Sequence, residues 1–131
     1  MNNYGILNNK KTFIFLFIIV FLASFLRLYK LDTLPQSLYW DEVAIGYNAY
    51  SISETLRDEY GNFLPILFKS YNDYKMPVYI YTVSLAVKML GLNELSVRLP
   101  SALFGISTVF ATFFLVRSLF EINSKRKELP S

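Results

Sequence analysis

Two adjacent carboxylates, Asp41 and Glu42, are the residues of this sequence whose type and spacing best suit chemistry. The chain has no Cys and no His, which excludes disulfides, thiolate metal sites and the commonest general base. Acid–base chemistry must therefore fall to Asp, Glu, Lys or Tyr. In the stretch "LYWDEVAIGYNAY", Tyr39 and Trp40 could form an apolar wall that tunes the proton affinity of Asp41 for work as a general base.

A structural role for the same pair is the alternative. An Asp that precedes a helix is most often its N-cap, and a Glu in the first turn suits the helix dipole. On the residues alone, capping is the more frequent use of such a pair. The two interpretations are compatible, because an Asp held at a helix start is also well positioned as a base.

Four basic residues between the acidic pair and the second apolar block are candidate ligands for a phosphate. They are Arg57, Lys69, Lys75 and Arg98. Each could instead be a solvated charge or the partner of a nearby acid. Lys75 differs in its context, because it lies between Tyr74 and "MP", where an apolar helix should begin and backbone N–H groups could also meet an anion.

A second acidic pair, Asp58 and Glu59, lies beside the turn signal Gly61-Asn62, and we interpret it mainly as turn structure. The sequence contains no glycine-rich phosphate loop, no zinc-ligand spacing and no serine-nucleophile elbow. We therefore expect no cofactor, and no metal is indicated, although a carboxylate pair could hold a divalent ion.

Two apolar blocks hold much of the 53% hydrophobic content and indicate the elements that position these residues. The first block, residues 12–29, reaches about 18 residues if Arg27 extends toward the membrane surface, which is near the lower limit for spanning a bilayer. The second, residues 99–117, is free of charge until Arg117. A cleaved signal peptide is the alternative for the first block, but no small-residue cleavage site follows it.

Charge predicts the topology. The outer flanks of the two blocks carry six basic residues and two acidic ones: Lys10, Lys11, Arg117, Lys125, Arg126 and Lys127 against Glu121 and Glu128. The connecting segment, 27–98, holds seven basic and eight acidic residues. The excess of positive charge therefore predicts cytoplasmic segments at 1–11 and 118–131 and an external loop at 30–98.

Within the external loop, the spacing of apolar residues predicts two helices, at about 42–57 and 77–90. Pro77 suits the first position of a helix and Gly91 suits its end, whereas Lys69–Pro77 is polar and typical of a loop. Lys88 makes the second helix too short to span a membrane. We therefore expect an all-α membrane protein with two transmembrane helices joined by a long external loop with interfacial amphipathic helices.

Four segments occur in a recognisable order between the two apolar blocks: "RLYKLDTLPQSLYWDEVAIGYNAY", "DEYGNFLP", "YNDYKMPVYIY" and "GLNELSVRLPSALFG". Together they resemble the N-terminal part of the C-type membrane glycosyltransferases that use polyprenyl-phosphate sugars. This superfamily includes the protein O-mannosyltransferases of glycosyltransferase family 39 and the aminoarabinose transferase that acts on lipid A. The resemblance covers about Arg27 to Val116.

The resemblance implies an inverting transfer of a sugar from a polyprenyl-phosphate donor to an acceptor hydroxyl on a lipid, glycan or protein, at the outer face of the plasma (inner) membrane. Asp41 would be the catalytic base and Glu42 its neighbour in the acidic pair. Lys75 matches the basic residue of a Lys-Pro segment expected to bind the donor's phosphate, although Met76 intervenes here. Supporting roles would fall to Tyr74, Arg57 and Arg98, the last of them structural.

Full members of the superfamily have many more membrane helices than two. The chain is therefore expected to be the N-terminal portion of a larger multi-span fold, incomplete as an enzyme on its own. The alternative function is a non-enzymatic two-span membrane protein whose external loop serves interaction or assembly. A third, weaker alternative is an exported protein with a cleaved signal peptide. Nucleic acid is not an expected partner, because the basic residues flank the apolar blocks and form no patch.

Overall fold

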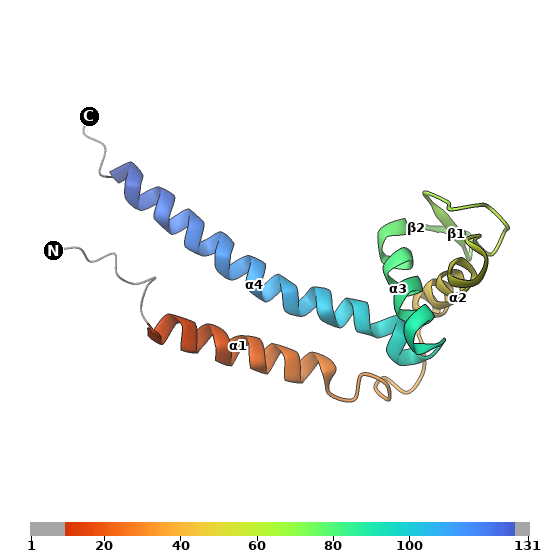
Figure 1. Cartoon of the computed structure of the whole chain (residues 1–131), viewed down its shortest axis with the longest axis horizontal. Coiled ribbons are helices and arrows are strands. Elements are labelled where there is room, and N and C mark those ends of the chain that lie inside the picture. Colours follow the sequence, from red (N-terminus) through yellow and green to blue (C-terminus); the bar gives the residue numbers. More distant parts are fainter. Residues whose placement is uncertain (1–9, 128–131) are drawn as a thin grey trace. The chain divides into compact units, whose positions relative to one another are not determined.

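The computed structural model describes the backbone of residues 10–127 and the side chains of residues 10–120 and 122. Residues 1–9 and 128–131, which belong to the predicted cytoplasmic segments, lie outside the described residues. The chain divides into two compact units. Unit 1 comprises Met1–Arg27 and Phe104–Ser131, and unit 2 comprises Leu28–Leu103. Helix α4 begins in unit 2 and continues into unit 1 (Figure 1).

Unit 1 contains the two apolar helices that the sequence predicts. Helix α1, Lys10–Leu28, has no buried residue, and its Phe, Ile and Leu side chains are largely exposed. Helix α4, Glu94–Lys127, contains a second stretch that is long and apolar enough to cross a membrane, Glu94–Phe120. Apolar side chains that remain exposed on long helices need a nonpolar surrounding, which a bilayer provides.

The start of α4 differs from the prediction. The second apolar block was expected to begin at Leu99, directly after the external loop, but the structure has one continuous helix from Glu94. Asn93 caps this helix, because its Oδ1 accepts a hydrogen bond from the backbone N–H of Ser96 at 2.8 Å. Pro100 lies inside the helix without ending it. The early start places Arg98 in the second turn of a helix, not in a loop.

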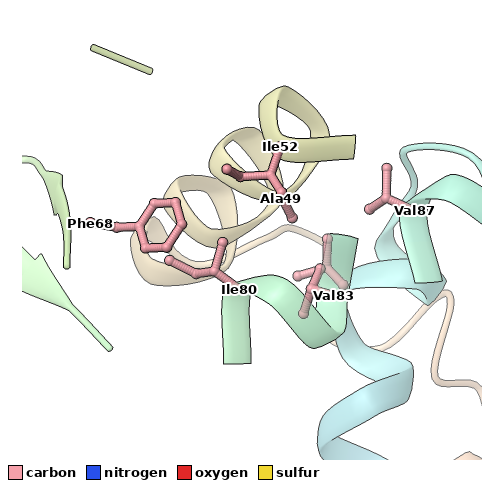
Figure 2. Close-up of a cluster of buried hydrophobic side chains, with 7 residues drawn as sticks. Ala49, Ile52, Phe68, Ile80, Val83 and Val87 are labelled. Carbon is pink, nitrogen blue, oxygen red and sulfur yellow. The ribbon is translucent and has the colours of Figure 1, made fainter. Parts of the chain in front are cut away.

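Unit 2 is built on the packing of α2, Trp40–Thr55, against α3, Pro77–Leu90. Their buried apolar side chains form the core together with Phe68, and Figure 2 shows this cluster. The cluster consists of Ala49, Ile52, Phe68, Ile80, Val83, Val87 and Val97. The spacing 80, 83 and 87 is that of one helix face, so the periodicity of the sequence correctly identifies the buried side of α3.

The observed boundaries confirm the predicted range of α3 and correct that of α2. Helix α3 begins at Pro77 as predicted and is followed by Gly91, whose φ of 79° suits a glycine. Helix α2 begins at Trp40 and ends at Thr55, two residues before the predicted range at each end. Leu56, predicted to continue the apolar face, is instead the C-cap with φ 58° and a half-exposed side chain.

A β-hairpin corrects the all-α prediction. Strands β1, Phe68–Ser70, and β2, Asp73–Lys75, pair antiparallel within the segment that was expected to be a loop. Tyr71 and Asn72 both have positive φ, 49° and 63°, as in the two-residue turns that match the twist of paired strands. The hairpin matters for function, because alternate residues of a strand share a face and β2 therefore places Asp73 and Lys75 on the same side.

Candidate active site

The first turn of α2 presents the acidic pair. Tyr39 is the N-cap, so Asp41 and Glu42 are the second and third residues of the helix. Glu42 performs the capping, because its Oε2 accepts a hydrogen bond from the backbone N–H of Tyr39 at 3.0 Å. The expectation that Asp41 would be the N-cap is therefore wrong. Its carboxylate is not used by the helix start and is 58% exposed.

Asp41 and Lys75 are 34 residues apart in the sequence and form an ion pair in the structure. Lys75 Nζ lies 2.5 Å from Asp41 Oδ1 and 2.8 Å from Asp73 Oδ2. The α2 N-terminus supplies the first carboxylate, and strand β2 supplies both the lysine and the second carboxylate. The structure thus brings together the two residues that the sequence singles out most strongly, and it adds Asp73.

The two carboxylates keep the lysine charged. The hydrogen bond to Asp41, followed by that to Asp73, raises the pKa of Lys75 above its ordinary value of 10.5. The hydrogen bond from Lys75 lowers the pKa of Asp73 below 3.8, and the backbone N–H of Tyr74 contributes to the same shift. Both pKa shifts favour a protonated Lys75 beside an ionised Asp73 near neutral pH. Two of the three N–H donors of the Lys75 ammonium group are used by these carboxylates.

Glu42 forms a different ion pair, with Arg98 of α4. Arg98 Nε donates to Glu42 Oε1 at 3.0 Å and its Nη2 donates to Oε2 at 3.2 Å, in the two-point geometry that favours Arg. The same guanidinium donates to the backbone carbonyls of Leu31, Pro35 and Ser37 at 3.2–3.3 Å. Only 6% of the Arg98 side chain is exposed. Arg98 therefore ties the segment before α2 to the start of α4.

The surroundings of Glu42 fix its charge. Burial by itself would raise the pKa of Glu42, but the hydrogen bonds from Arg98 and from the backbone of Tyr39 outweigh it and hold this pKa below 4.5. The Glu42 carboxylate thus accepts three hydrogen bonds, two at Oε2 and one at Oε1. Glu42 and Arg98 together link the first turn of α2 to the start of α4.

The other supporting residues lie differently. Tyr74 is on β2 between Asp73 and Lys75, so its exposed side chain projects from the opposite face of the strand. Arg57 contacts its own turn: its Nη1 donates to the carbonyl of Gly61 at 2.7 Å, and its guanidinium lies 5.9 Å from the ring centroid of Phe63. Arg57 is thus engaged in shaping the turn.

In the second acidic pair, as in the first, the two neighbouring acids have different hydrogen-bond partners. Asp58 is buried, and its Oδ1 accepts hydrogen bonds from the backbone N–H groups of Tyr60 and Asn62. Burial would raise the pKa of Asp58, but the hydrogen bonds from Asn62 and the neighbouring backbone lower it overall. This contact pattern agrees with turn structure. Glu59 is not part of that hydrogen-bond network.

Aromatic side chains surround the start of α2. Tyr39 and Trp40 are both more than two-thirds exposed, and the Trp40 ring meets Tyr71 of the hairpin edge-on at 5.4 Å between centroids. Exposed amphipathic rings of this kind suit a membrane–water interface. Within residues 10–127, no three acidic side chains come close enough together to hold a metal ion.

The arrangement supplies two complementary groups side by side at a helix start. Asp41 can accept a proton, and Lys75 can stabilise a developing negative charge. Asp73 also holds Lys75 from its own strand, with its Oδ2 at 2.8 Å from the lysine Nζ.

The model of the dolichyl-phosphate-mannose-protein mannosyltransferase family matches residues 17–123 of this chain. The matched range includes the first-turn acids, the hairpin lysine and the anchoring Arg98. No curated protein and no solved structure gave a match.

Proposed function

The chain belongs to the dolichyl-phosphate-mannose-protein mannosyltransferase family, and we propose that it contributes the catalytic residues of an inverting glycosyltransferase. The donor is a polyprenyl-phosphate sugar, and the acceptor is a hydroxyl on a lipid, glycan or protein. The observation that carries the proposal is the pairing of Asp41 with Lys75, two residues from different elements that have opposite charge and complementary chemical abilities.

In the proposed reaction, Asp41 takes the proton of the acceptor hydroxyl as the hydroxyl oxygen attacks the anomeric carbon. A new carbon–oxygen bond forms on one face of the sugar while the bond to the donor phosphate breaks on the other. The electron pair of the broken bond leaves with the phosphate, whose negative charge Lys75 stabilises. Attack opposite to the leaving group inverts the anomeric centre.

The ion pair of Asp41 and Lys75 gives this reaction an ordered start. While the two side chains are in contact, Lys75 is occupied by carboxylates and Asp41 is held by a cation. A donor phosphate that replaces Asp41 on Lys75 would free the carboxylate to accept a proton. Asp41 is the partner that can leave, because its side chain is 58% exposed whereas that of Lys75 is 17% exposed.

Binding of a polyprenyl phosphate without sugar tests the role of Lys75. In the purified full chain, Lys75→Ala should weaken binding roughly 10–100-fold, the range expected for loss of a hydrogen bond between charged groups. Lys69→Ala is the matched control, because Lys69 is exposed on the other strand of the same hairpin. Binding is measured by native mass spectrometry. Unchanged affinity in Lys75→Ala, or equal loss in both variants, would reject the proposal.

We also propose that unit 2 lies on the outer face of the plasma membrane. The chain contains no Cys, so a single introduced Cys reports its own accessibility. Glu54 is exposed in α2, and Lys11 is exposed at the start of α1. On intact cells, a membrane-impermeant maleimide should label Glu54→Cys and should label Lys11→Cys only after the cells are opened. The reverse pattern of labelling would overturn the orientation.

A further inference from the structure

Asp73 is the third charged residue of the cluster around Lys75, and the proposed reaction gives its carboxylate no step. Its Oδ2 atom lies 2.8 Å from Lys75 Nζ, and its Oδ1 atom accepts a hydrogen bond from the backbone N–H of Tyr74 at 2.7 Å. The second of these bonds fixes the carboxylate on its own strand. Asp73 therefore contacts the lysine from a defined position.

The β-hairpin keeps Asp73 and Lys75 together. Both lie on the same face of β2, and the residues opposite them on β1 are Ser70 and Phe68. Ser70 and Phe68 are buried and the side chain of Lys75 is only 17% exposed, so the lysine has little freedom to move away. Asp41, in contrast, reaches the lysine from α2. A ligand that displaces Asp41 therefore still finds Asp73 beside Lys75.

A phosphate bound to Lys75 meets the charge of Asp73 as well. Two oxygens that accept hydrogen bonds from one ammonium nitrogen lie within about 5 Å of each other, because each bond is about 2.8 Å long. Asp73 therefore repels every negative charge that the phosphate carries. With Asp41 displaced, the charges of Lys75 and Asp73 sum to zero, and the lysine attracts the phosphate only because it is nearer. Each further negative charge on the phosphate thus adds little to the affinity.

Phosphates on lipids differ in this charge. A phosphodiester carries one negative charge near neutral pH, whereas a phosphomonoester carries two once the pH exceeds its second pKa of about 6. We propose that Asp73 is a specificity-determining residue, which opposes doubly charged phosphomonoesters at Lys75 and leaves the site to singly charged phosphodiesters. In the proposed function the donor is a diester and the lipid phosphate left after transfer is a monoester, so Asp73 would favour release of this product. That consequence rests on the proposed function, whereas the charge preference does not.

Two probes that differ by one ionisable hydroxyl test the preference: geranyl phosphate and its methyl ester. Binding to the purified full chain is measured by isothermal titration calorimetry. At pH 7.5, Asp73→Asn should strengthen the binding of geranyl phosphate about 3–10-fold more than that of the methyl ester, the effect of one unit charge about 5 Å away at a water-exposed surface. The matched control, Glu54→Gln, removes an exposed acid about 20 Å further along α2 than Asp41 and should leave the ratio of the two affinities unchanged.

The pH dependence separates an effect of charge from an effect of structure. At pH 5 both probes carry close to one negative charge, so Asp73→Asn should change their affinities equally, and the difference should appear as geranyl phosphate ionises toward pH 7.5. The pKa of Asp73 is lowered below 3.8 and that of Lys75 is raised above 10.5, so neither side chain titrates in this range. The other charged groups near the site are Asp41 and Glu42 of α2, Lys69 of β1 and Arg98 of α4. They are the same in wild type and in Asp73→Asn, so their contributions cancel in the comparison.

A conservative variant and the pattern of change decide the outcome. Asp73→Glu keeps the charge and should retain a ratio of affinities close to that of wild type. Circular dichroism checks that each variant is folded. Equal strengthening of both probes at pH 7.5 in Asp73→Asn would mean that Asp73 only occupies a hydrogen-bond donor, and equal weakening would mean that it only positions the lysine. Either result, or no change in either affinity, would overturn the proposal.

A kinetic arm separates this role from the proposed reaction. In a complete multi-span transferase that carries this chain, polyprenyl phosphate should inhibit transfer about 3–10-fold more strongly in Asp73→Asn than in wild type. A charge preference in the binding measurement together with transfer that does not depend on Asp41 would support the role of Asp73 and reject the proposed reaction. Transfer that depends on Asp41 without any charge preference would support the reaction and overturn the role of Asp73.

Discussion

Asp41 and Glu42 are neighbours in the sequence, yet each belongs to a different ion pair with a different environment. Glu42 meets the buried Arg98, which also binds three backbone carbonyls, whereas the exposed carboxylate of Asp41 meets Lys75. The first cluster is fully engaged in holding the chain together. The second can exchange partners with little loss of stability. We propose that burial and the number of partners, more than residue type, separate an anchoring carboxylate from a catalytic one.

The largest effect on stability should come from the anchor. Arg98→Met leaves the Glu42 carboxylate and three carbonyls without their donor, so it should lower the free energy of unfolding by about 3–5 kcal/mol. The measurement is chemical unfolding in detergent, followed by circular dichroism. Lys88→Met, an exposed change on α3, is the control. A loss below about 1 kcal/mol would mean that Arg98 is no anchor and that the two clusters do not differ.

A smaller effect should follow from Glu42→Gln, which keeps the shape but removes the charge. We expect a loss of about 1.5–3 kcal/mol at neutral pH.

The change should also alter the response to acid. The pKa of Glu42 is lowered in the folded chain, so its contribution is fully present above the ordinary value of 4.5 and is lost as the pH falls through the folded value. Stability should therefore decline less steeply below pH 4.5 in Glu42→Gln than in wild type. Part of the decline should remain, because Asp58 also has a lowered pKa. An unchanged slope would contradict the anchoring role of Glu42.

Sequence reasoning located the apolar helices, the boundaries of α3 and the residues of the ion pair, because these depend on local signals such as apolar period, Pro77 and Gly91. It could not locate the partners of Arg98. Those contacts join residues more than 55 positions apart, and no local pattern encodes them. The hairpin was missed for another reason. Its strands have three residues each, too few for an alternating pattern, although Asn72 was a signal for the turn.

The site was predicted in part. Asp41 and Lys75 were chosen from the sequence, and the structure places them in contact. Asp73 was not singled out from the sequence, although its position two residues before Lys75 in a strand puts both on one face. The capping role fell to Glu42 because α2 begins two residues before its predicted start, which makes Tyr39 the N-cap. A shift of this size is common at helix ends, and here it exchanges the roles of two adjacent acids.

The most direct test compares Asp41→Asn with wild type in membranes that carry this chain as part of a complete multi-span transferase and that transfer sugar from polyprenyl-phosphate mannose. The account predicts that Asp41→Asn changes the free energy of unfolding by no more than about 1 kcal/mol, because its ion pair is exposed. It also predicts that the rate of transfer falls by about 10²–10⁴-fold, the usual contribution of a general base. Transfer at an undiminished rate in a folded Asp41→Asn variant would contradict the central claim.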